Sequence, residues 1–549
     1  MSAADVFDYV IVGGGNAGCV LASQLKQGDP SLSILLIEAG PDVSNHSLVA
    51  DGSKYTLLLG SEIDWNYHTV PQRHLGGRVL SNHAGKALGG GTAINGGGWL
   101  RGAKEDYDLW ADLVGDSQWS YEGFLPYFRK VESHFDPDGD REAHGFEGPI
   151  KTESVTSTGR RYPLRREVEE AWRTVGVTYN PDMNSGNPLG VVEVVENRVV
   201  GLRQMSSSVY PLDIEILTDT LVGRVVIEEN NGRKVATAVE LADGGRRIAA
   251  RREVVLSAGA YRSPQILMLS GIGPADELHS HGIDVILDLP DVGRHFHDHI
   301  AVSQWWKLKH PERGLSIGSP VFIDPTLFKG LPLDFVVTQS VPLDGLREAL
   351  VKDDPSVHPD KHPLVCSQRG HFETYTIYVA NNPENPVIKM DGTHITTSVA
   401  CMLPTSRGSV TLKDRSPHSS PVIDPNYFAT ETDRYTMRQG LRRVREVLRD
   451  TPAGQGMIES ETVEEGAMPL TATSDDAQLD DLARRRITLY HPSGSASMGK
   501  VVDGELRVMG VDGLRVVDAS VIPMPLAAHI QMCVYALAEK AAGIIQGKH

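Results

Sequence analysis

The sequence has few of the features that mark disulfide-rich, membrane or metal-binding proteins. Its four cysteines, Cys19, Cys366, Cys401 and Cys533, are far apart and form no CxxC pair. This pattern excludes a disulfide framework and a cysteine zinc site, and it fits a reducing compartment. No run of about 18 apolar residues predicts a membrane span. We see no signal peptide either, and we expect a cytoplasmic or other intracellular protein.

Positive charge is also scarce. The chain carries 53 Lys and Arg against 71 Asp and Glu, a formal net charge of −18. An acidic chain is not attracted to phosphate backbones or anionic lipid, so we expect no nucleic-acid or membrane partner. The motif HExxH is absent, which gives no support to a zinc peptidase, and we do not expect an α/β-hydrolase.

Glycine, by contrast, is abundant, with 55 residues in a chain of 549. A chain of this length exceeds a single core, because domains usually hold about 100–200 residues. The first glycine tract, VIVGGGNAG, lies between a predicted buried strand at 7–12 and a predicted helix at 17–25. A second strand at 33–37 ends on Glu38. This arrangement predicts a Rossmann-like nucleotide site.

Each residue type in this unit has a physical role. Gly13 permits the tight turn, Gly15 lets the backbone approach a pyrophosphate, and Gly18 lets the helix pack on the strand. The helix N-terminus offers free N–H groups to phosphates, and Glu38 would accept hydrogen bonds from a ribose. The acid favours NAD or FAD over NADP. This loop alone does not distinguish NAD from FAD. The candidate contacts are Gly13, Gly15, Asn16, Ala17, Gly18, Glu38 and Ala39.

A second glycine tract, GKALGGGTAINGGGWLRGAKEDYD at 85–108, resembles the first signature of the glucose–methanol–choline (GMC) oxidoreductases. The stretch GAYRSPQILMLSGIG at 259–273 is similar to their second signature, and further landmarks follow in order over nearly the whole chain. The resemblance implies FAD. Some members link FAD covalently through a histidine where this chain has Ile94, so we predict non-covalent FAD. The further FAD contacts that it implies are Gly89, Gly91, Asn95, Gly96, Gly97, Val222, Asp518, Ala519, Ile530 and Gln531.

Two histidines near the C-terminus are the candidate catalysts. A lone histidine is more often structural, but the resemblance places His491 and His529 at the two active-site positions of the family. A neutral imidazole can take the proton of an alcohol whose hydride goes to flavin N5. We assign His491 as the principal base and His529 as its partner, and the reverse order stays open. A predicted helix at 531–546 would direct its N-terminus at the flavin and stabilise negative charge there.

The stretch HFHDH at 295–299 looks like a metal cluster, since alternate histidines of a strand share one face. The end of this stretch, Asp298–His299, matches a family element that binds no metal, and we predict no metal site.

The order of elements predicts an α/β protein of two discontinuous domains. A Rossmann-like FAD-binding domain would combine 1–155, 200–298 and 484–549. An α+β substrate domain, a sheet with helices on one side, would combine 156–199 and 299–483. Alternating runs such as HITTSVACML support strands in the second domain.

The expected function is FAD-dependent oxidation of a small alcohol, with electrons passed to oxygen or another acceptor. A rival reading is a lyase or cyclase that keeps FAD without net redox change, because fold does not fix function. A flavin-bearing protein without catalysis is a third reading, and the two matched histidines oppose it.

Overall fold

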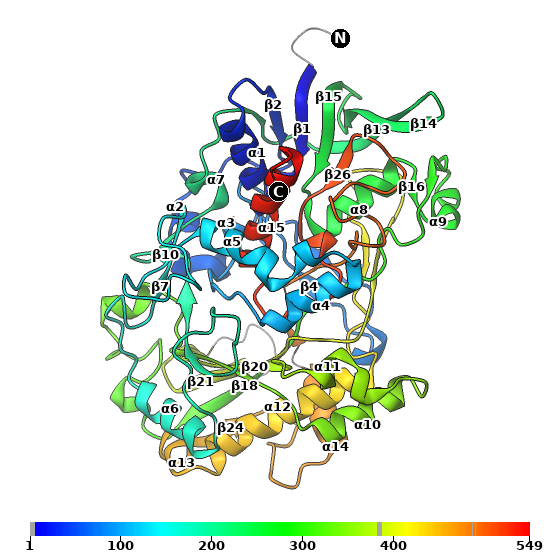
Figure 1. Cartoon of the computed structure of the whole chain (residues 1–549). Coiled ribbons are helices and arrows are strands. Elements are labelled where there is room, and N and C mark those ends of the chain that lie inside the picture. Colours follow the sequence, from blue (N-terminus) through cyan, green and yellow to red (C-terminus); the bar gives the residue numbers. More distant parts are fainter. Residues whose placement is uncertain (1–5, 381–386, 486, 489, 549) are drawn as a thin grey trace.

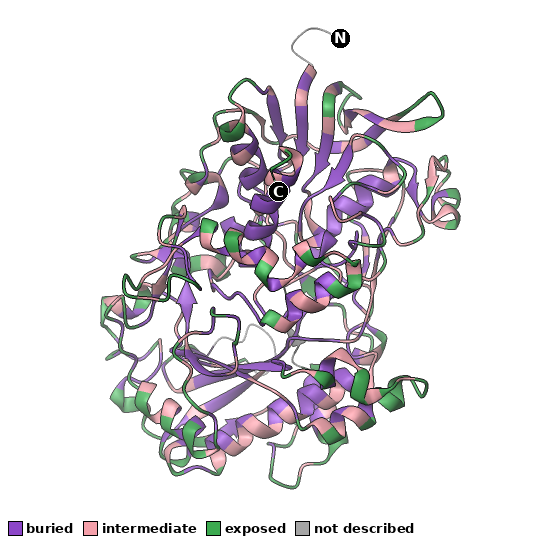
Figure 2. Ribbon diagram, viewed as in Figure 1, coloured by how far each residue is buried: buried purple, intermediate pink, exposed green. Residues whose placement is uncertain are grey.

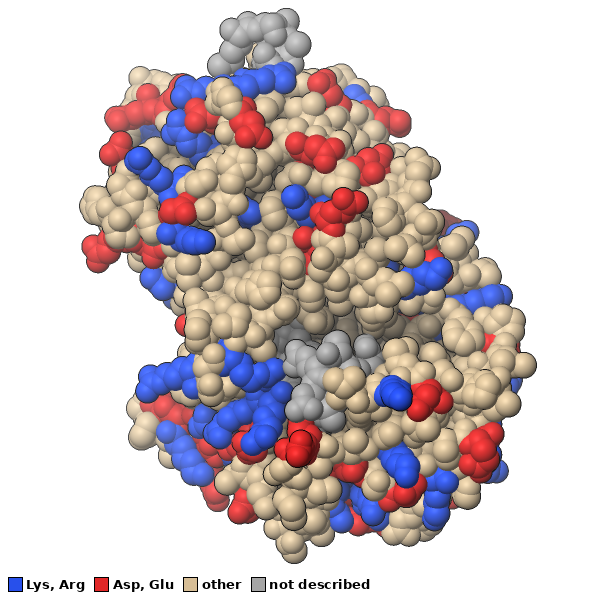
Figure 3. All heavy atoms as spheres, turned by 180° about the vertical axis from the view of Figure 1, so that it is seen from behind, with Lys and Arg blue, Asp and Glu red and all other residues tan. Residues whose placement is uncertain are grey.

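The computed structural model describes residues 6–380, 387–485, 487–488 and 490–548, with no side chain described at 487 and 488. These residues form two parts, each built around a sheet, which lie one above the other in Figure 1. Seen from behind, the surface is hollowed between the upper and the lower part (Figure 3). No helix among the described residues has both the length and the apolar character needed to span a bilayer.

The upper part contains a seven-stranded sheet. Its order is β12 (Glu215–Leu217), β2 (Ile34–Ile37), β1 (Val6–Val12), β15 (Arg247–Leu256), β14 (Arg233–Leu241) and β13 (Val222–Asn230), with β26 (Leu514–Val516) also paired to β15. Strands β12, β2, β1, β15 and β26 run parallel, and β14 and β13 are antiparallel additions. Apart from Val6 at its start, the β-branched and aliphatic residues of β1 and β2 are buried, as expected for parallel strands covered on both faces.

Helices α1 (Asn16–Gly28) and α15 (Gln531–Ile545) pack against each other beside this sheet, although they come from opposite ends of the chain (Figure 1). The predicted strand, glycine loop, helix and strand are confirmed within a few residues at each boundary. The last helix is buried along almost its whole length. The chain's two ends therefore build one nucleotide-type unit.

The lower part contains a seven-stranded antiparallel sheet. Its order is β24 (Ile458–Thr462), β18 (Ile300–Leu308), β21 (His394–Cys401), β20 (Phe372–Ile377), β19 (Phe335–Gln339) and β8 (Gly190–Glu193), with β25 (Ile487–Thr488) paired to β18. Side chains alternate between the faces of such strands. One face packs on α12 (Glu431–Arg449), and the other faces the upper part (Figure 1).

Other helices support these layers. They are α3 (Gly91–Ile94), α4 (Lys104–Val114), α5 (Tyr121–Val131), α6 (Arg165–Thr174), α8 (Gly259–Leu269), α10 (Leu343–Asp353), α13 (Pro452–Met457) and α14 (Asp476–Arg485). Each sheet has its own large hydrophobic core, and most of both sheets is buried, while the protruding end of β13 and β14 and the outer helix faces are exposed (Figure 2). Mixed α/β architecture with a Rossmann-like part is thus confirmed. The predicted domain bounds stay a prediction, since β25 of the predicted FAD-binding domain belongs to the lower sheet and the lower core includes Leu75, Leu80 and Leu100.

Candidate active site

A cavity of about 600 Å³ lies between the two sheets, within the usual range for small-molecule sites. At one end it is lined by Val12 and Glu38, where β1 and β2 of the upper sheet finish. At the other end Ala301, Tyr375 and Ala400 line it from the inner face of the lower sheet. Both halves of the molecule therefore build one site.

The glycine loop after β1 shapes the upper end of the cavity. Gly13 has φ +103°, and a Cβ there would collide with the carbonyl oxygen of Ser257. A Cβ on Gly18 would collide with the carbonyl oxygen of Gly13, so this glycine allows α1 to pack on the loop. Gly15 is different, because the nearest atom to its Cβ would be the Gly90 Cα at 3.8 Å. The backbone at Gly15 is thus open to a ligand, as a pyrophosphate requires.

Glu38 lies at the cavity wall just after β2. Its carboxylate accepts hydrogen bonds of 2.8 Å from the N–H groups of Gly14 and Gly40. Burial raises the pKa of Glu38 to about 7, and these backbone N–H groups oppose the rise. Each carboxylate oxygen has a second lone pair, so the side chain can still accept a hydrogen bond from a ribose hydroxyl.

The cavity brings together nearly all of the residues that the sequence assigned to the cofactor. Only Gly18 and Gly89 among them lie outside its lining. Gly18 serves helix packing, and Gly89 faces Ser207 and Met205 instead. The predicted residues that line the cavity are Gly13, Gly15, Asn16, Ala17, Glu38, Ala39, Gly91, Asn95, Gly96, Gly97, Val222, Asp518, Ala519, Ile530 and Gln531.

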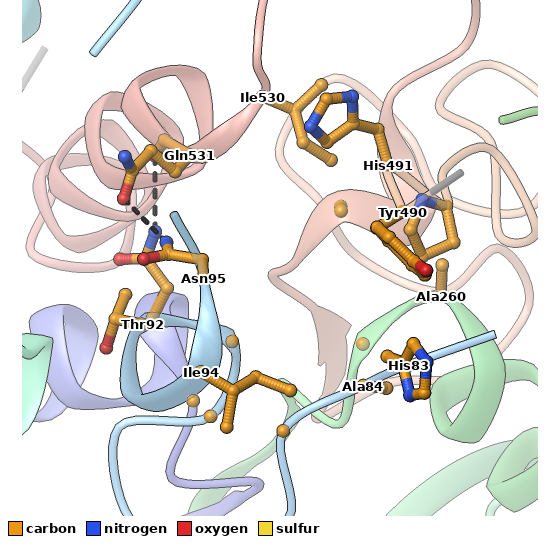
Figure 4. A pocket seen from close by; sticks show the side chains of 18 of the residues that line it. His83, Ala84, Thr92, Ile94, Asn95, Ala260, Tyr490, His491, Ile530 and Gln531 are labelled. Carbon is orange, nitrogen blue, oxygen red and sulfur yellow. Dashed lines mark hydrogen bonds between the residues drawn. The ribbon is translucent and has the colours of Figure 1, made fainter. Parts of the chain in front are cut away.

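Polar side chains hold the start of α15 against the second glycine tract. Gln531 accepts a hydrogen bond of 3.0 Å from Asn95 Nδ2 (Figure 4). It also donates one to the carbonyl oxygen of Gly98. Asn16 Nδ2 also donates to the Gln531 carbonyl oxygen, while its buried Oδ1 has no partner among the described residues. Asp518 accepts from the N–H groups of Gly259 and Ser520. The helix N-terminus is therefore fixed beside the cavity.

These features fit FAD. The upper end offers an open glycine backbone, a buried acid and the N-terminus of α1, which together suit an adenosine diphosphate group. Asn95, Gly96 and Gly97 continue the lining toward the lower sheet and could contact the flavin ring. Ile94 also lines the cavity and has no nucleophilic atom. Because Ile94 cannot form a bond to the cofactor, non-covalent binding of FAD remains our prediction.

The two candidate catalytic histidines meet at the lower end of the cavity. His491 follows β25, and His529 precedes α15. Their ring centroids are 4.7 Å apart, and both rings line the cavity. The sequence separates them by 37 intervening residues, so only the fold places the two imidazoles together.

A third histidine joins this pair. His299, at the start of β18, has its Nδ1 2.8 Å from His491 Nδ1. Burial, with the charge of His529 second, lowers the pKa of His299 to about 3. Burial followed by the charges of His529 and His299 also holds the pKa of His491 well below its usual range. Both rings are therefore neutral at pH 7, and one donates to the other.

The histidine-rich stretch at 295–299 does not converge on one point. His295 lies 2.6 Å from Asp291 Oδ1, and His297 is buried with its Nδ1 near the His295 carbonyl oxygen. Only His299 reaches the cavity. Sequence reasoning weighed this stretch as a metal motif and missed His299 as a neighbour of His491.

Sequence reasoning also missed two residues of β20. The Tyr375 hydroxyl lies 2.8 Å from His529 Nε2, and Glu373 Oε2 lies 3.3 Å from the same nitrogen. Tyr375 also donates a short hydrogen bond to Glu373 Oε2. The available signal was a lone acid in an otherwise apolar and hydroxyl-bearing strand, FETYTI, with a tyrosine two residues later on the same face.

Comparison with known proteins agrees with this geometry. Two family models described as GMC oxidoreductase match residues 7–301 and 404–538. The GMC-type oxidoreductase acuG of Aspergillus aculeatus is 41% identical over 547 residues, covering 98% of this chain and 99% of that protein. An alcohol dehydrogenase [acceptor] of Pseudomonas putida is 31% identical, covering 99% and 96%. A solved formate oxidase variant of Aspergillus oryzae RIB40 is 28% identical with a TM-score of 0.87, covering 100% and 99%.

Proposed function

Because the chain belongs to the GMC oxidoreductase family, whose cofactor is FAD, we propose that it oxidises an alcohol group of a small molecule to a carbonyl group. One observation carries the proposal. The imidazoles of His491 and His529 lie in the same cavity as the nucleotide-type glycine loop. A bound alcohol would thus be placed between a cofactor site and two groups able to accept its proton.

When bound, FAD supplies the acceptor for the hydride of the alcohol carbon. The chain itself supplies the rest of the chemistry. One imidazole takes the hydroxyl proton, and the other donates or accepts a hydrogen bond that holds the oxygen in line. Asp298 supports the pair, because its Oδ1 accepts a 2.6 Å hydrogen bond from the His491 backbone N–H. The N-terminus of α15 directs N–H groups into the same region and favours negative charge there.

The lining around the histidines favours a neutral and mainly apolar alcohol. Aliphatic side chains from several segments line this end: Leu100, Val194, Leu331, Leu333, Val336 and Met402. The charged side chains among the described lining residues are Glu38, Arg262 and Asp518, and none comes from the lower sheet. A carboxylate or a polyol would meet few partners here, so its desolvation would be poorly offset.

Anaerobic titration tests the proposed function against the lyase or cyclase reading. The purified protein, loaded with FAD, is mixed without oxygen with primary aliphatic and aromatic alcohols. We expect the flavin absorbance to bleach and one equivalent of carbonyl product to form. Product formation with an unchanged flavin spectrum would favour the lyase or cyclase reading instead.

A second panel tests the class of substrate. Apolar primary alcohols are compared with sugar alcohols and with formate in the same anaerobic assay. We expect kcat/KM at least about 10-fold higher for the apolar alcohols, which corresponds to about 1.4 kcal/mol. Equal or faster reaction with formate would show that the cavity accepts an anion. Electron transfer to oxygen or another acceptor is then read from reoxidation in air and with artificial acceptors.

A further inference from the structure

A short hairpin in contact with the second glycine tract brings two arginines together. Arg198 and Arg203 lie directly opposite each other in the antiparallel pair of β10 (Arg198–Val199) and β11 (Leu202–Arg203). Like charges in such a cross-strand position repel each other and destabilise the pairing. Burial, followed by the charge of Arg198, lowers the pKa of Arg203 to about 9, so this guanidinium still carries its proton at pH 7. The hairpin therefore holds two positive charges side by side at an energetic cost.

The chain supplies a counter-ion to only one of these two arginines within its described residues. Arg198 Nε lies 3.4 Å from Glu196 Oε1. Arg203 pairs with no carboxylate of the described chain, and its Nη2 is buried there without a hydrogen-bond partner. Asp51 acts on the charge of Arg203 from a distance and is itself paired with Lys54 at 3.1 Å. Because a shielded charge without a counter-ion is costly, the charge of Arg203 calls for a negative charge nearby.

Arg203 holds Asn95, a residue of the cavity wall. Its Nη1 donates to the carbonyl oxygen of Asn95 at 2.6 Å and to Asn95 Oδ1 at 3.0 Å. Because the amide oxygen accepts from the guanidinium, the amide nitrogen is the atom directed away from it. This nitrogen donates one hydrogen to Gln531 Oε1 and keeps a second hydrogen for a ligand (Figure 4). Arg203 therefore sets the orientation of the Asn95 amide.

The two arginines also orient the backbone of the same loop. Arg203 donates to the Thr92 carbonyl oxygen at 3.2 Å, and Arg198 Nη2 donates to the Gly96 carbonyl oxygen at 2.7 Å. The N–H groups of Gly96 and Gly97 have no acceptor within the described parts of the chain, and both glycines line the cavity. Carbonyl oxygens are thus bound by the arginines, while N–H donors are left for a ligand. Such a wall favours negative charge in the cavity.

We propose that Arg203 is a positioning residue that orients Asn95 and, through its unpaired charge, stabilises the negative charge that FAD gains on reduction. This inference rests on the proposed alcohol oxidation. The C–H bond of the alcohol breaks, its hydrogen and electron pair pass to FAD as a hydride, and the hydroxyl proton goes to an imidazole. The cofactor then carries one more negative charge. A fixed positive charge behind the cavity wall lowers the free energy of this reduced form relative to oxidised FAD.

The reduction potential of bound FAD tests this role without turnover. The holoenzyme is reduced chemically, without oxygen or alcohol, in the presence of a redox dye of known potential. Arg203→Met removes the charge and the hydrogen bonds, whereas Arg203→Lys keeps the charge. Arg166→Met is the matched control, because it removes one positive charge from an 85% exposed side chain on α6. FAD content and the melting temperature of each protein are recorded alongside.

Loss of the charge has a defined signature. In Arg203→Met we expect the equilibrium constant for reduction of bound FAD to fall at least about 10-fold, which lowers the potential of a two-electron couple by about 30 mV. Arg203→Lys should keep most of the wild-type potential, and Arg166→Met should match wild type. A wild-type potential in Arg203→Met, or an equal fall in Arg166→Met, would overturn the proposal.

A further variant covers the case in which Arg203→Met does not fold. Arg203→Gln keeps a donor for the Asn95 oxygens but has no charge, so its potential should fall as in Arg203→Met. A potential in Arg203→Gln equal to that of Arg203→Lys would show that charge is not responsible and would refute the proposal. The titration is also independent of the substrate. If no alcohol bleaches the flavin but the potentials shift as expected, the proposed oxidation fails while the role of Arg203 stands.

Discussion

At the scale of single residues, three imidazoles share one cavity but have different partners. His299 is buried and neutral beside His491, whereas His529 contacts the hydroxyl and carboxylate of β20. Burial lowers the pKa of both His299 and His491, and the three rings differ in the hydrogen bonds that orient them. The chemistry of the pair cannot be assigned from residue type alone.

Replacing either histidine by alanine tests this division of roles. His491→Ala and His529→Ala should each slow flavin reduction by about 10²–10⁴-fold while FAD stays bound, because neither ring carries the nucleotide loop. The measurements are stopped-flow reduction rates and FAD absorbance per protein. A wild-type rate in either variant would remove that histidine from the mechanism.

At the scale of elements, the glycine loop between β1 and α1 combines two demands. The backbone at Gly13 has to turn sharply next to the Ser257 carbonyl oxygen, and the backbone at Gly15 has to leave room for a ligand. The first demand concerns the fold, and the second concerns the cofactor. Substitutions at the two positions should therefore separate folding from FAD binding.

Gly15→Ala should fold but bind FAD at least about 10-fold more weakly, a loss of about 1.4 kcal/mol. Gly15 has φ −80°, which alanine tolerates, and its methyl group would lie at an ordinary van der Waals distance of 3.8 Å from the Gly90 Cα. Gly13→Ala should lose soluble folded protein, because its φ of +103° and the Ser257 carbonyl oxygen exclude a Cβ. Gly456→Ala in α13, where the added Cβ has no atom within 4 Å, is the control for FAD affinity. Unchanged affinity in Gly15→Ala would contradict the assigned phosphate contact.

A buried charge network joins the end of α5 to neighbouring loops. His144 Nδ1 lies 2.7 Å from Glu132 and its Nε2 lies 2.9 Å from Asp182, while Arg101 pairs with Glu132 at 3.0 Å. His134, Glu132 and His144 are close enough together for a metal, but both nitrogens of His144 already contact carboxylates. Although burial opposes it, these hydrogen bonds raise the pKa of His144 to about 9.

Stability should consequently fall as the pH rises through this range. The folded pKa of His144, about 9, exceeds the unfolded value of about 6.5, so the folded state binds the extra proton between these values. The stabilisation is complete below pH 6.5 and is lost as the pH passes 9. In urea unfolding, the difference between wild type and His144→Asn should shrink by about 2–3 kcal/mol from pH 6 to pH 10. His310→Asn, at an exposed site, is the matched surface control.

At the scale of the whole molecule, the two sheets share the cavity and so share the cofactor. Each sheet has its own core, and the hollow between the parts is visible from behind (Figure 3). A ligand that contacts both parts stabilises both, since it binds only the folded arrangement. Lys and Arg gather on the lower part of this rear face, although the chain as a whole is acidic (Figure 3).

Removal of FAD should lower the melting temperature, and adding it back should restore stability with concentration. At 100 times its Kd, FAD would contribute about 2.7 kcal/mol. Hydrogen exchange should show that FAD protects β1 and β2 of the upper sheet and also β18 and β20 of the lower sheet. Protection restricted to the upper sheet would show that the cavity does not couple the two parts.

Local sequence patterns were enough to predict much of the upper part of the molecule and its cofactor site. The spacing of glycines and the acid after β2 act over about 30 residues, so strand, loop and helix could be predicted without tertiary information. The second glycine tract and the family resemblance extended this to FAD and to the two histidines. The domain boundaries at 156–199 and 299–483 remain proposals, because the sheet pairing of β25 with β18 lies across them.

The sequence by itself determined the Rossmann-like unit and the family, and it singled out the two histidines as candidates, because these depend on residue type and short spacing. The tertiary structure alone decided which partners those histidines have. His299, at the start of β18, contacts His491. Glu373 and Tyr375 contact His529 across the interface between the sheets. Such contacts depend on strand register and sheet packing between segments more than 150 residues apart in sequence. Local sequence patterns do not encode such long-range contacts, yet these contacts set the hydrogen bonding of the site's imidazoles.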